Sequence, residues 1–180
     1  NRMYYLDYQG VRFISLDGYS MKNFPASHVI ITDWLKKVLG DNPNRWTILM
    51  NHYPVYSCTM NRDNPETRDL LLPFLEQFKV DLVLQGHDHT YCRGQHPAAE
   101  QKGSWSPVYV VSVAGPKAND IQPLQWGQKA GADIQLYQHI SISGDSLSYS
   151  SWAANQKLFD AFILVKRPGQ NNQVAEGEWF

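Results

Sequence analysis

The sequence predicts an α/β fold, and two observations point to it. Two short apolar runs, Trp46–Met50 and Val80–Leu84, are bounded by Gly, Pro and Asn, which is typical of buried strands. Segments with the spacing and end signals of helices precede each run. After residue 107 the chain is expected to consist mainly of strands, so helices and strands share one fold.

The first elements are expected to be a hairpin and a helix. Met3–Tyr8 and Val11–Leu16 are predicted strands, and Gly10 permits the tight turn between them. The helix is expected over Ser27–Leu39, with Ser27 as its N-cap. Its apolar stripe consists of Ile31, Trp34, Leu35 and Val38.

A second helix is expected over residues 65–79, after a polar loop. Asn64 suits its cap, and Pro65 suits its first turn. Pro73 has no backbone N–H, so we expect the helix to break or restart there. Arg93–Ser106 is expected to be a long loop of the kind that shapes a site.

The last part of the chain is expected to be a meander followed by a frayed tail over residues 168–180. We see no repeat and no linker, so residues 1–166 are expected to belong to one domain, with a tail at 167–180. The expected strands are Val108–Ala114, Ile134–Ser143, Ser146–Ala153 and Leu158–Val165.

Composition excludes several classes of partner. The 180 residues carry 16 basic and 17 acidic side chains, a net charge of -1, which predicts no nucleic-acid partner and no anionic membrane partner. No apolar run approaches the roughly 20 residues of a membrane span. Aromatic residues make up 13% of the chain, which argues against disorder.

Three histidines follow the two apolar runs directly. Asn51 and His52 come after the first run, and Gly86, His87 and His89 after the second. Ligand sites in open α/β sheets gather beyond the carboxyl ends of strands, and neutral imidazole is the commonest protein metal ligand. This placement predicts part of a metal site. Gly86 is expected to allow a backbone bend there. His28 is expected to be a surface or core residue and His139 a solvated one, and neither is expected to be a ligand.

These two blocks, Asn-His at 51–52 and Gly-His-Asp-His at 86–89, resemble the last two motif blocks of the calcineurin-like metallophosphoesterases. The similarity is greatest to the purple acid phosphatase-like branch, and it extends to the segments 34–39, 107–111 and 158–162. The resemblance implies the family's two-sheet α/β/β/α sandwich. The family's upstream blocks (Asp-x-His, Gly-Asp-x-x-Asp or Tyr, and Gly-Asn-His) are absent, so we expect only the C-terminal portion of the domain.

The resemblance implies a metal-dependent phosphoric ester hydrolase, a phosphomonoesterase of the acid phosphatase type. The intact protein would hold two divalent or trivalent metal ions (Fe, Zn or Mn). His52 and His87 would bind one ion and His89 the other, and catalysis would act through these metals. A fragment without the N-terminal metal-binding motifs is expected to be inactive. The alternatives are a phosphodiesterase or nucleotidase of the same fold, or a non-catalytic secreted domain with vestigial ligands.

Further residues near the predicted site have open roles. Tyr91, Arg93 and His96 are expected to contact substrate, with loop packing as the alternative. Cys58 and Cys92 could form a disulfide, remain free thiols or bind metal. The expected partners are a phosphate ester, the missing N-terminal half and a second copy of the chain. The resemblance implies a periplasmic or extracellular location.

Overall fold

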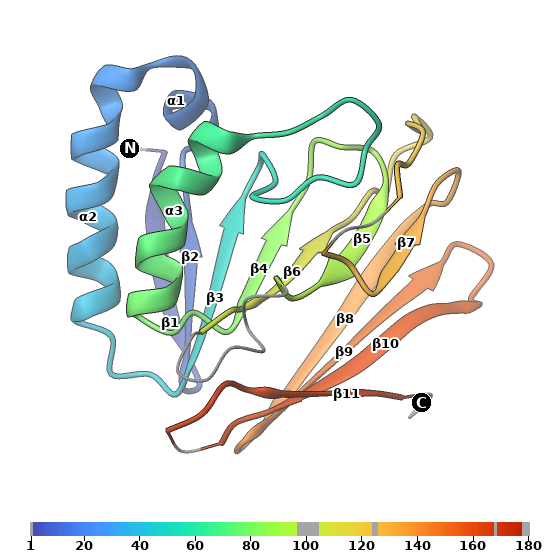
Figure 1. Ribbon diagram of the computed structural model, residues 1–180. Helices are drawn as coiled ribbons and strands as arrows, with labels where there is room; N and C mark the ends of the chain where they lie inside the picture. Colours follow the sequence, from blue (N-terminus) through green and yellow to red (C-terminus); the bar gives the residue numbers. More distant parts are fainter. Residues whose placement is uncertain (1, 97–104, 124–125, 168, 178–180) are drawn as a thin grey trace.

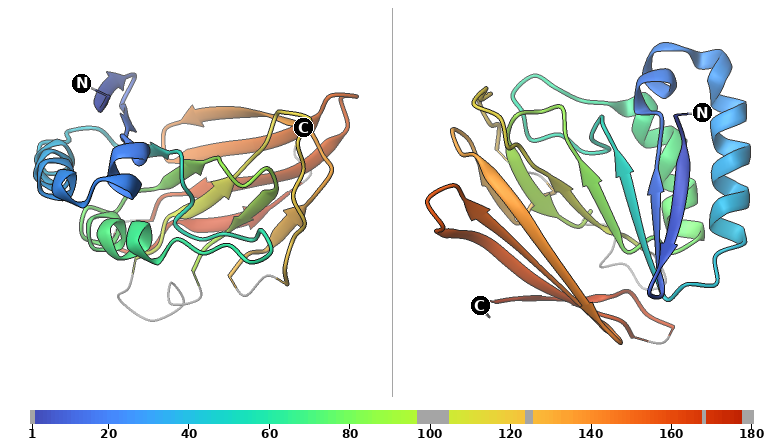
Figure 2. Two further views of the ribbon diagram at one scale, coloured as in Figure 1. Left: turned by 90° about the horizontal axis from the view of Figure 1, so that it is seen from above. Right: turned by 180° about the vertical axis from the view of Figure 1, so that it is seen from behind.

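The computed structural model describes residues 2–96, 105–123, 126–167 and 169–177. Two β-sheets pack face to face, and helices cover the outer face of the larger sheet (Figures 1 and 2). This agrees with the predicted two-sheet α/β fold. The described residues form the helical layer and both sheets of an α/β/β/α sandwich, and none of them forms a helical layer over the smaller sheet. No helix in these ranges is long and apolar enough to cross a membrane.

The larger sheet has seven strands in the order β1-β2-β3-β4-β6-β5-β7. The predicted hairpin is confirmed, since β1 and β2 pair in antiparallel fashion. β2, β3, β4 and β6 are parallel neighbours, so the two apolar runs lie side by side in the middle of the sheet. The strands are β1 (Tyr4–Tyr8), β2 (Val11–Ser15), β3 (Trp46–Asn51), β4 (Leu82–Gln85), β5 (Tyr91–Gly94), β6 (Val108–Val111) and β7 (Lys129–Gly131).

The smaller sheet is the predicted meander with one further strand. β8 (Leu136–Ser143), β9 (Ser146–Ala153) and β10 (Leu158–Val165) pair in sequence order. The expectation of a frayed tail is wrong for Gln173–Glu176, because this segment forms β11 and pairs with β10. Its backbone hydrogen bonds complete the edge of the sheet, and an ion pair from Glu176 to Arg93 anchors it.

Helix α3 (Pro65–Gln77) runs through Pro73 without the expected break. Leu71 and Leu75 on either side of Pro73 are fully buried against the sheet, and this packing outweighs the hydrogen bond that proline cannot make. Helix α2 (His28–Gly40) lies beside α3, preceded by the 3₁₀ turn η1 (Pro25–Ser27).

A short helix that the sequence analysis did not anticipate, α1 (Gly18–Asn23), follows β2. The carboxylate of Asp17 caps it by accepting hydrogen bonds from the Ser20 backbone N–H (2.9 Å) and hydroxyl (2.7 Å). Asp17 therefore ends the strand and starts a helix. A Cβ at Gly18 would lie 2.5 Å from Oδ1 of Asn51 and 3.2 Å from the backbone nitrogen of His52, so a larger residue there would displace the Asn51 side chain.

The expected loop over Arg93–Ser106 is wrong at its start, where Arg93 and Gly94 belong to β5. β5 lies antiparallel to β6 and forms one of the inner strands of the larger sheet. Residues 97–104 of that expected loop lie outside the described ranges.

The core has two parts, one on each face of the larger sheet. Ile14, Leu49 and Val83 face the helices, whereas Ile48 and Leu82 face the smaller sheet. The central strands are thus buried on both faces, which explains their continuous apolar sequences. Their carboxyl ends emerge together at one edge of the sheet (Figure 1), and this edge carries the predicted site.

Candidate functional site

His52 and His87 lie together at the carboxyl ends of β3 and β4. The parallel pairing of Asn51 with Gln85 brings the following residues side by side. Nε2 of His52 lies 3.2 Å from Nδ1 of His87, and the two ring centroids are 5.0 Å apart. Two of the three predicted ligands therefore meet as expected.

His89 does not join this pair. Its Nδ1 lies 3.3 Å from the backbone oxygen of Lys117, on the segment that follows β6. The expectation that all three histidines converge is wrong for this conformation. Throughout the described ranges, no group of three or more His, Cys, Asp or Glu side chains is placed to hold a metal ion.

The turn between His87 and His89 explains the divergence. Both histidines have positive φ angles, 68° and 45°, in the left-handed region that side chains other than glycine rarely adopt. The bend expected at Gly86 thus occurs at the histidines, and a Cβ at Gly86 would make only an ordinary contact 3.8 Å from His52. Asp88 between them points inward, and the two rings leave the turn toward different partners.

Asp88 holds this turn from inside the protein. Its carboxylate is completely buried and accepts hydrogen bonds from the Ser57 hydroxyl (2.5 Å) and from Arg62 (3.2 Å). Its backbone oxygen accepts hydrogen bonds from Thr59 (3.0 Å) and Asn119 (2.8 Å). The loop after β3 and the segment after β6 therefore both fix the position of the turn.

A disulfide joins Cys58 to Cys92, with the two Cα atoms 6.3 Å apart. It connects the loop after β3 to β5, which follows the turn that contains His87, Asp88 and His89 (the histidine turn). Of the three roles that the sequence left open for these cysteines, the bridge is therefore correct.

Arg93 and Tyr91 do not face the histidines, and the expectation that they contact substrate is wrong for this structure. Arg93 lies between the two sheets. All five of its N–H groups donate hydrogen bonds, which Asp160, Glu176 and Gln128 accept. The Tyr91 hydroxyl donates to Asp160 at 2.6 Å, and its ring is fully buried. Neither residue has a donor left for a phosphate.

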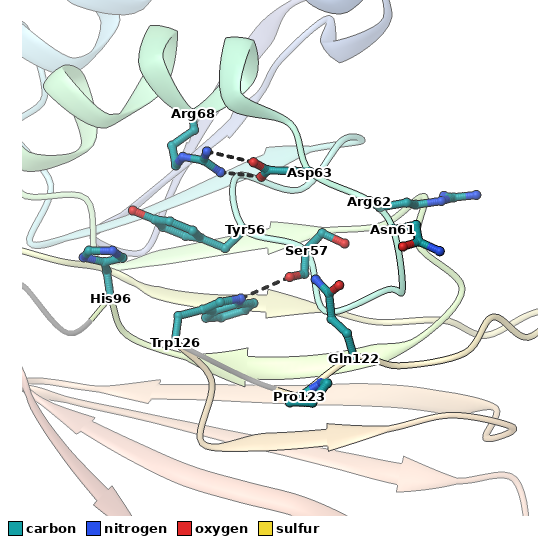
Figure 3. A pocket seen from close by; sticks show the side chains of 10 residues that line it. All are labelled: Tyr56, Ser57, Asn61, Arg62, Asp63, Arg68, His96, Gln122, Pro123 and Trp126. Atoms are coloured by element: carbon teal, nitrogen blue, oxygen red, sulfur yellow. Dashed lines mark hydrogen bonds and ion pairs between the residues drawn. The ribbon is translucent and has the colours of Figure 1, made fainter.

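The remaining histidines lie in three different settings. His96 is stacked on Tyr56, with ring centroids 4.9 Å apart, and lines a cavity of about 760 Å³ (Figure 3). His28 lies 2.7 Å from the backbone oxygen of Met21, and His139 is exposed on the smaller sheet. Of the three substrate contacts that the sequence predicted, only His96 is therefore next to a cavity.

The environment of His87 favours the neutral ring. Partial burial lowers its pKa from the ordinary 6.5, and the positive charge of Arg62 and the neighbouring His52 lower it further. A second cavity, of about 360 Å³, lies beside His52 at the ends of β2, β3 and β4. Two buried polar atoms at this edge, Oδ1 of Asn51 and Nε2 of Gln85, have no hydrogen-bond partner among the described residues.

The donor set fits part of a metal centre. His52 and His87 offer two neutral nitrogen donors from one side, which suits a first-row ion. A two-metal centre also needs charge compensation, and neither nearby carboxylate offers it: Asp88 is committed to Ser57 and Arg62, and Asp17 caps α1. The described residues therefore do not fit the complete centre.

Two comparisons of the sequence with known proteins both give a similarity to phosphoesterases. Residues 3–91 match the family model of the calcineurin-like phosphoesterases. Purple acid phosphatase 4 of Arabidopsis thaliana is 36% identical over 90 residues, and purple acid phosphatase 17 of the same plant is 36% identical over 93. These matches cover 49% and 50% of this chain but only 24% and 25% of the relatives.

Solved structures extend the similarity to nearly the whole chain. The purple acid phosphatase from yellow lupin (Lupinus luteus) seeds superimposes with a TM-score of 0.70 at 18% identity, over 92% of this chain and 33% of that one. PhoD gives a TM-score of 0.67 at 14% identity, over 97% of this chain and 43% of that one. At these identities, the likeness shows a shared fold.

Proposed function

Because this chain is related to the purple acid phosphatases and carries a calcineurin-like phosphoesterase region at residues 3–91, we propose that it serves the hydrolysis of phosphoric monoesters. The observation that carries the proposal is the pair of imidazoles, 3.2 Å apart, at the carboxyl ends of two parallel strands. Ligand sites of open α/β sheets lie at this edge.

In this proposal His52 and His87 are metal ligands, and the Asp88 network is the support that orients them. His89 is the third ligand, which the left-handed turn separates from the first two in the present conformation. A segment that this chain does not contain supplies the bridging carboxylate and the other ligands. By themselves, the 180 residues are then unable to hydrolyse a phosphate ester.

Metal binding tests the ligand assignment. We expect one Zn²⁺ ion to bind the chain weakly in titration calorimetry, because two neutral imidazoles provide no negative charge. His52→Ala or His87→Ala should abolish this binding, while the exposed His139→Ala should leave it unchanged. Two tightly held ions, or turnover of an aryl phosphate by the chain alone, would contradict the assignment.

A non-catalytic binding domain is the second candidate. Its supporting observation is that, in the part of the chain that the structure describes, no three ligand side chains are gathered. The test uses a protein that also contains the ligand-bearing segment. If its aryl phosphatase activity is undiminished by His52→Ala and His87→Ala, the two histidines are not needed for hydrolysis. This outcome would favour the non-catalytic domain over the first proposal.

We also propose an oxidising location, extracellular or periplasmic. The support is the Cys58–Cys92 disulfide, since such bonds persist mainly outside the cytosol. Fractionation of cells that produce the protein, with the thiols labelled before and after reduction, tests this proposal.

A further inference from the structure

The cavity of about 760 Å³ that Tyr56, His96 and Trp126 line has no role in the proposal above (Figure 3). We infer that it binds the planar heteroaromatic group of an organic phosphate, a ligand of the nucleoside class. The placing of the phosphate group at the histidines rests on the proposed function, but the binding of the ring does not.

The cavity and the histidine turn share a wall. Ser57 and Arg62 both line the cavity, and both bind the carboxylate of Asp88, the residue between His87 and His89. Ser57 and Arg62 therefore connect a ligand in the cavity to the turn. The volume is in the range of ordinary small-molecule sites.

One side of the cavity is aromatic. Tyr56 lines it and is only 8% exposed, with His96 stacked on it at an interplanar angle of 19°. The Trp126 ring lies 5.6 Å from Tyr56, and its Nε1 donates to the backbone oxygen of Ser57 at 3.2 Å. Because Tyr56 is covered, the accessible ring surfaces are those of the half-buried His96 and Trp126. Flat, partly exposed rings held in place provide a surface on which a planar ligand can stack.

The polar groups favour a heterocycle over a plain hydrocarbon ring. Asn61 and Gln122 line the cavity, and each carboxamide can both donate and accept hydrogen bonds. A nucleobase has donors and acceptors along its edge, whereas a phenyl ring has none. The amides therefore match the nucleoside class.

Charge orients the ligand. Arg68 makes two hydrogen bonds to Asp63, at 2.6 and 3.0 Å, so this pair is close to neutral. Arg62 is also paired, with Asp88 at 3.2 Å, but Asp88 is completely buried while Arg62 keeps 36% of its side chain exposed. Of the two arginines that line the cavity, Arg62 is thus the one whose guanidinium is more accessible to a ligand, and it lies next to the histidine turn. A phosphate is expected at that guanidinium, with the base against Trp126 and His96.

Equilibrium dialysis with adenosine, which has no phosphate, tests the ring site without reference to catalysis. We expect saturable binding that weakens about tenfold in Trp126→Ala and in His96→Ala, the size usual for loss of one stacking partner. Trp126→Phe should retain most of the affinity. Matched substitutions on the smaller sheet, Trp152→Ala and His139→Ala, should have no effect.

Adenosine 5′-monophosphate tests the orientation. It should bind more tightly than adenosine, and Arg62→Ala should remove this advantage without weakening adenosine itself. Melting temperatures of all variants identify any that fail to fold. Absence of adenosine binding, or equal loss in Trp126→Ala and Trp152→Ala, overturns the inference and leaves the phosphoesterase proposal standing. Ring binding with no phosphatase activity in a protein that carries the remaining ligands supports the inference and removes the proposed function.

Discussion

Asp88 shows how one buried carboxylate can control a site without touching a ligand. An unpaired charge in this position would be costly, but Asp88 receives hydrogen bonds from Ser57 and Arg62. These bonds stabilise a turn in which two residues adopt the left-handed conformation, which costs about 1–3 kcal/mol for each residue. The interactions of Asp88 therefore offset backbone strain at both histidines.

We expect Asp88→Asn to lower the free energy of unfolding by about 2 kcal/mol, since hydrogen bonds to charged groups contribute roughly 1.5–3 kcal/mol. Urea unfolding measures this change. Asp145→Asn is the matched control, because Asp145 also pairs with an arginine, Arg45, but both side chains are largely exposed. Such surface pairs contribute about 0–1 kcal/mol. Equal losses in the two variants would contradict the role given to Asp88.

Among the structural elements, the loop after β3 and strand β5 are joined by the Cys58–Cys92 disulfide, which stabilises both. The disulfide closes a loop across 34 positions of sequence. The disulfide restricts the unfolded chain, and for a loop of this length this adds roughly 3–4 kcal/mol to the free energy of unfolding. The same bond holds the loop that carries Ser57 and Thr59 against the histidine turn.

The Cys58→Ser, Cys92→Ser double variant is therefore expected to melt at a clearly lower temperature than the oxidised protein. Dithiothreitol should lower the melting temperature of the unaltered protein to nearly the same value and should not affect the double variant. A melting temperature unaffected by dithiothreitol, with reduction verified by mass, would show that the bridge does not stabilise the fold.

The β1–β2 hairpin has a pH-dependent contact. Arg12 donates two hydrogen bonds to Asp7, at 2.7 and 2.6 Å, and a third to the backbone oxygen of Val38 at 2.5 Å. The bonds from Arg12 lower the pKa of Asp7 below its ordinary 3.8, while its slight burial opposes this. A carboxyl group with a lowered pKa stabilises the fold above its unfolded pKa, and this contribution is lost as pH falls through the folded value.

We expect the stability difference between the unaltered protein and Asp7→Asn to be constant from about pH 7 to pH 5 and to shrink below about pH 4. Denaturant unfolding at a series of pH values measures it. A difference that grows as the pH falls would have the wrong sign for this contact.

At the scale of the whole molecule, β1 leaves one edge of the larger sheet without a partner among the described strands. Every residue of β1 is exposed, including Tyr4, Leu6 and Tyr8, each more than half accessible. An exposed strand edge with apolar side chains favours pairing with another chain. Both expected protein partners, a second copy and the N-terminal half, would suit this edge.

We expect the isolated chain to self-associate in multi-angle light scattering as its concentration rises. Leu6→Lys should reduce the association because it places a charge in the middle of the edge strand. Met60→Lys is the control, since Met60 is a loop residue of similar exposure, 49% against 56%. A monomer at every concentration, or equal effects of the two substitutions, would contradict a role for β1.

The sequence predicted the parts of the fold that depend on local pattern. The β3 and β4 runs, helix α2 and the β8–β10 meander all follow from periodicity and turn residues. Helix α3 was misjudged at Pro73 because tertiary packing of Leu71 and Leu75 determines the outcome there. β5 and β11 were missed because they are short and are held by contacts with distant parts of the chain.

The same distinction applies to the candidate site. Placement after two adjacent strands predicted that the three histidines lie together, and this is correct for His52 and His87. The pairing of these two at one metal was implied by the family resemblance. The direction of His89 depends on φ angles that Asp88 and its distant partners stabilise, and no local pattern reports these angles. Arg93 was assigned to substrate because it follows the histidines, whereas its partners Asp160 and Glu176 come 67 and 83 residues later.

That long separation has a consequence for biosynthesis. A ribosome produces β5 well before β10 and β11, so the guanidinium of Arg93 emerges long before either carboxylate that neutralises it. Until translation reaches Asp160, the strand next to the histidine turn carries a cation that has no carboxylate partner and is therefore costly to bury. Burial of β5 between the two sheets is therefore expected only after β10 and β11 have been synthesised. In a nascent polypeptide stalled before β10, the histidine turn would lie beside a strand β5 that is not yet packed.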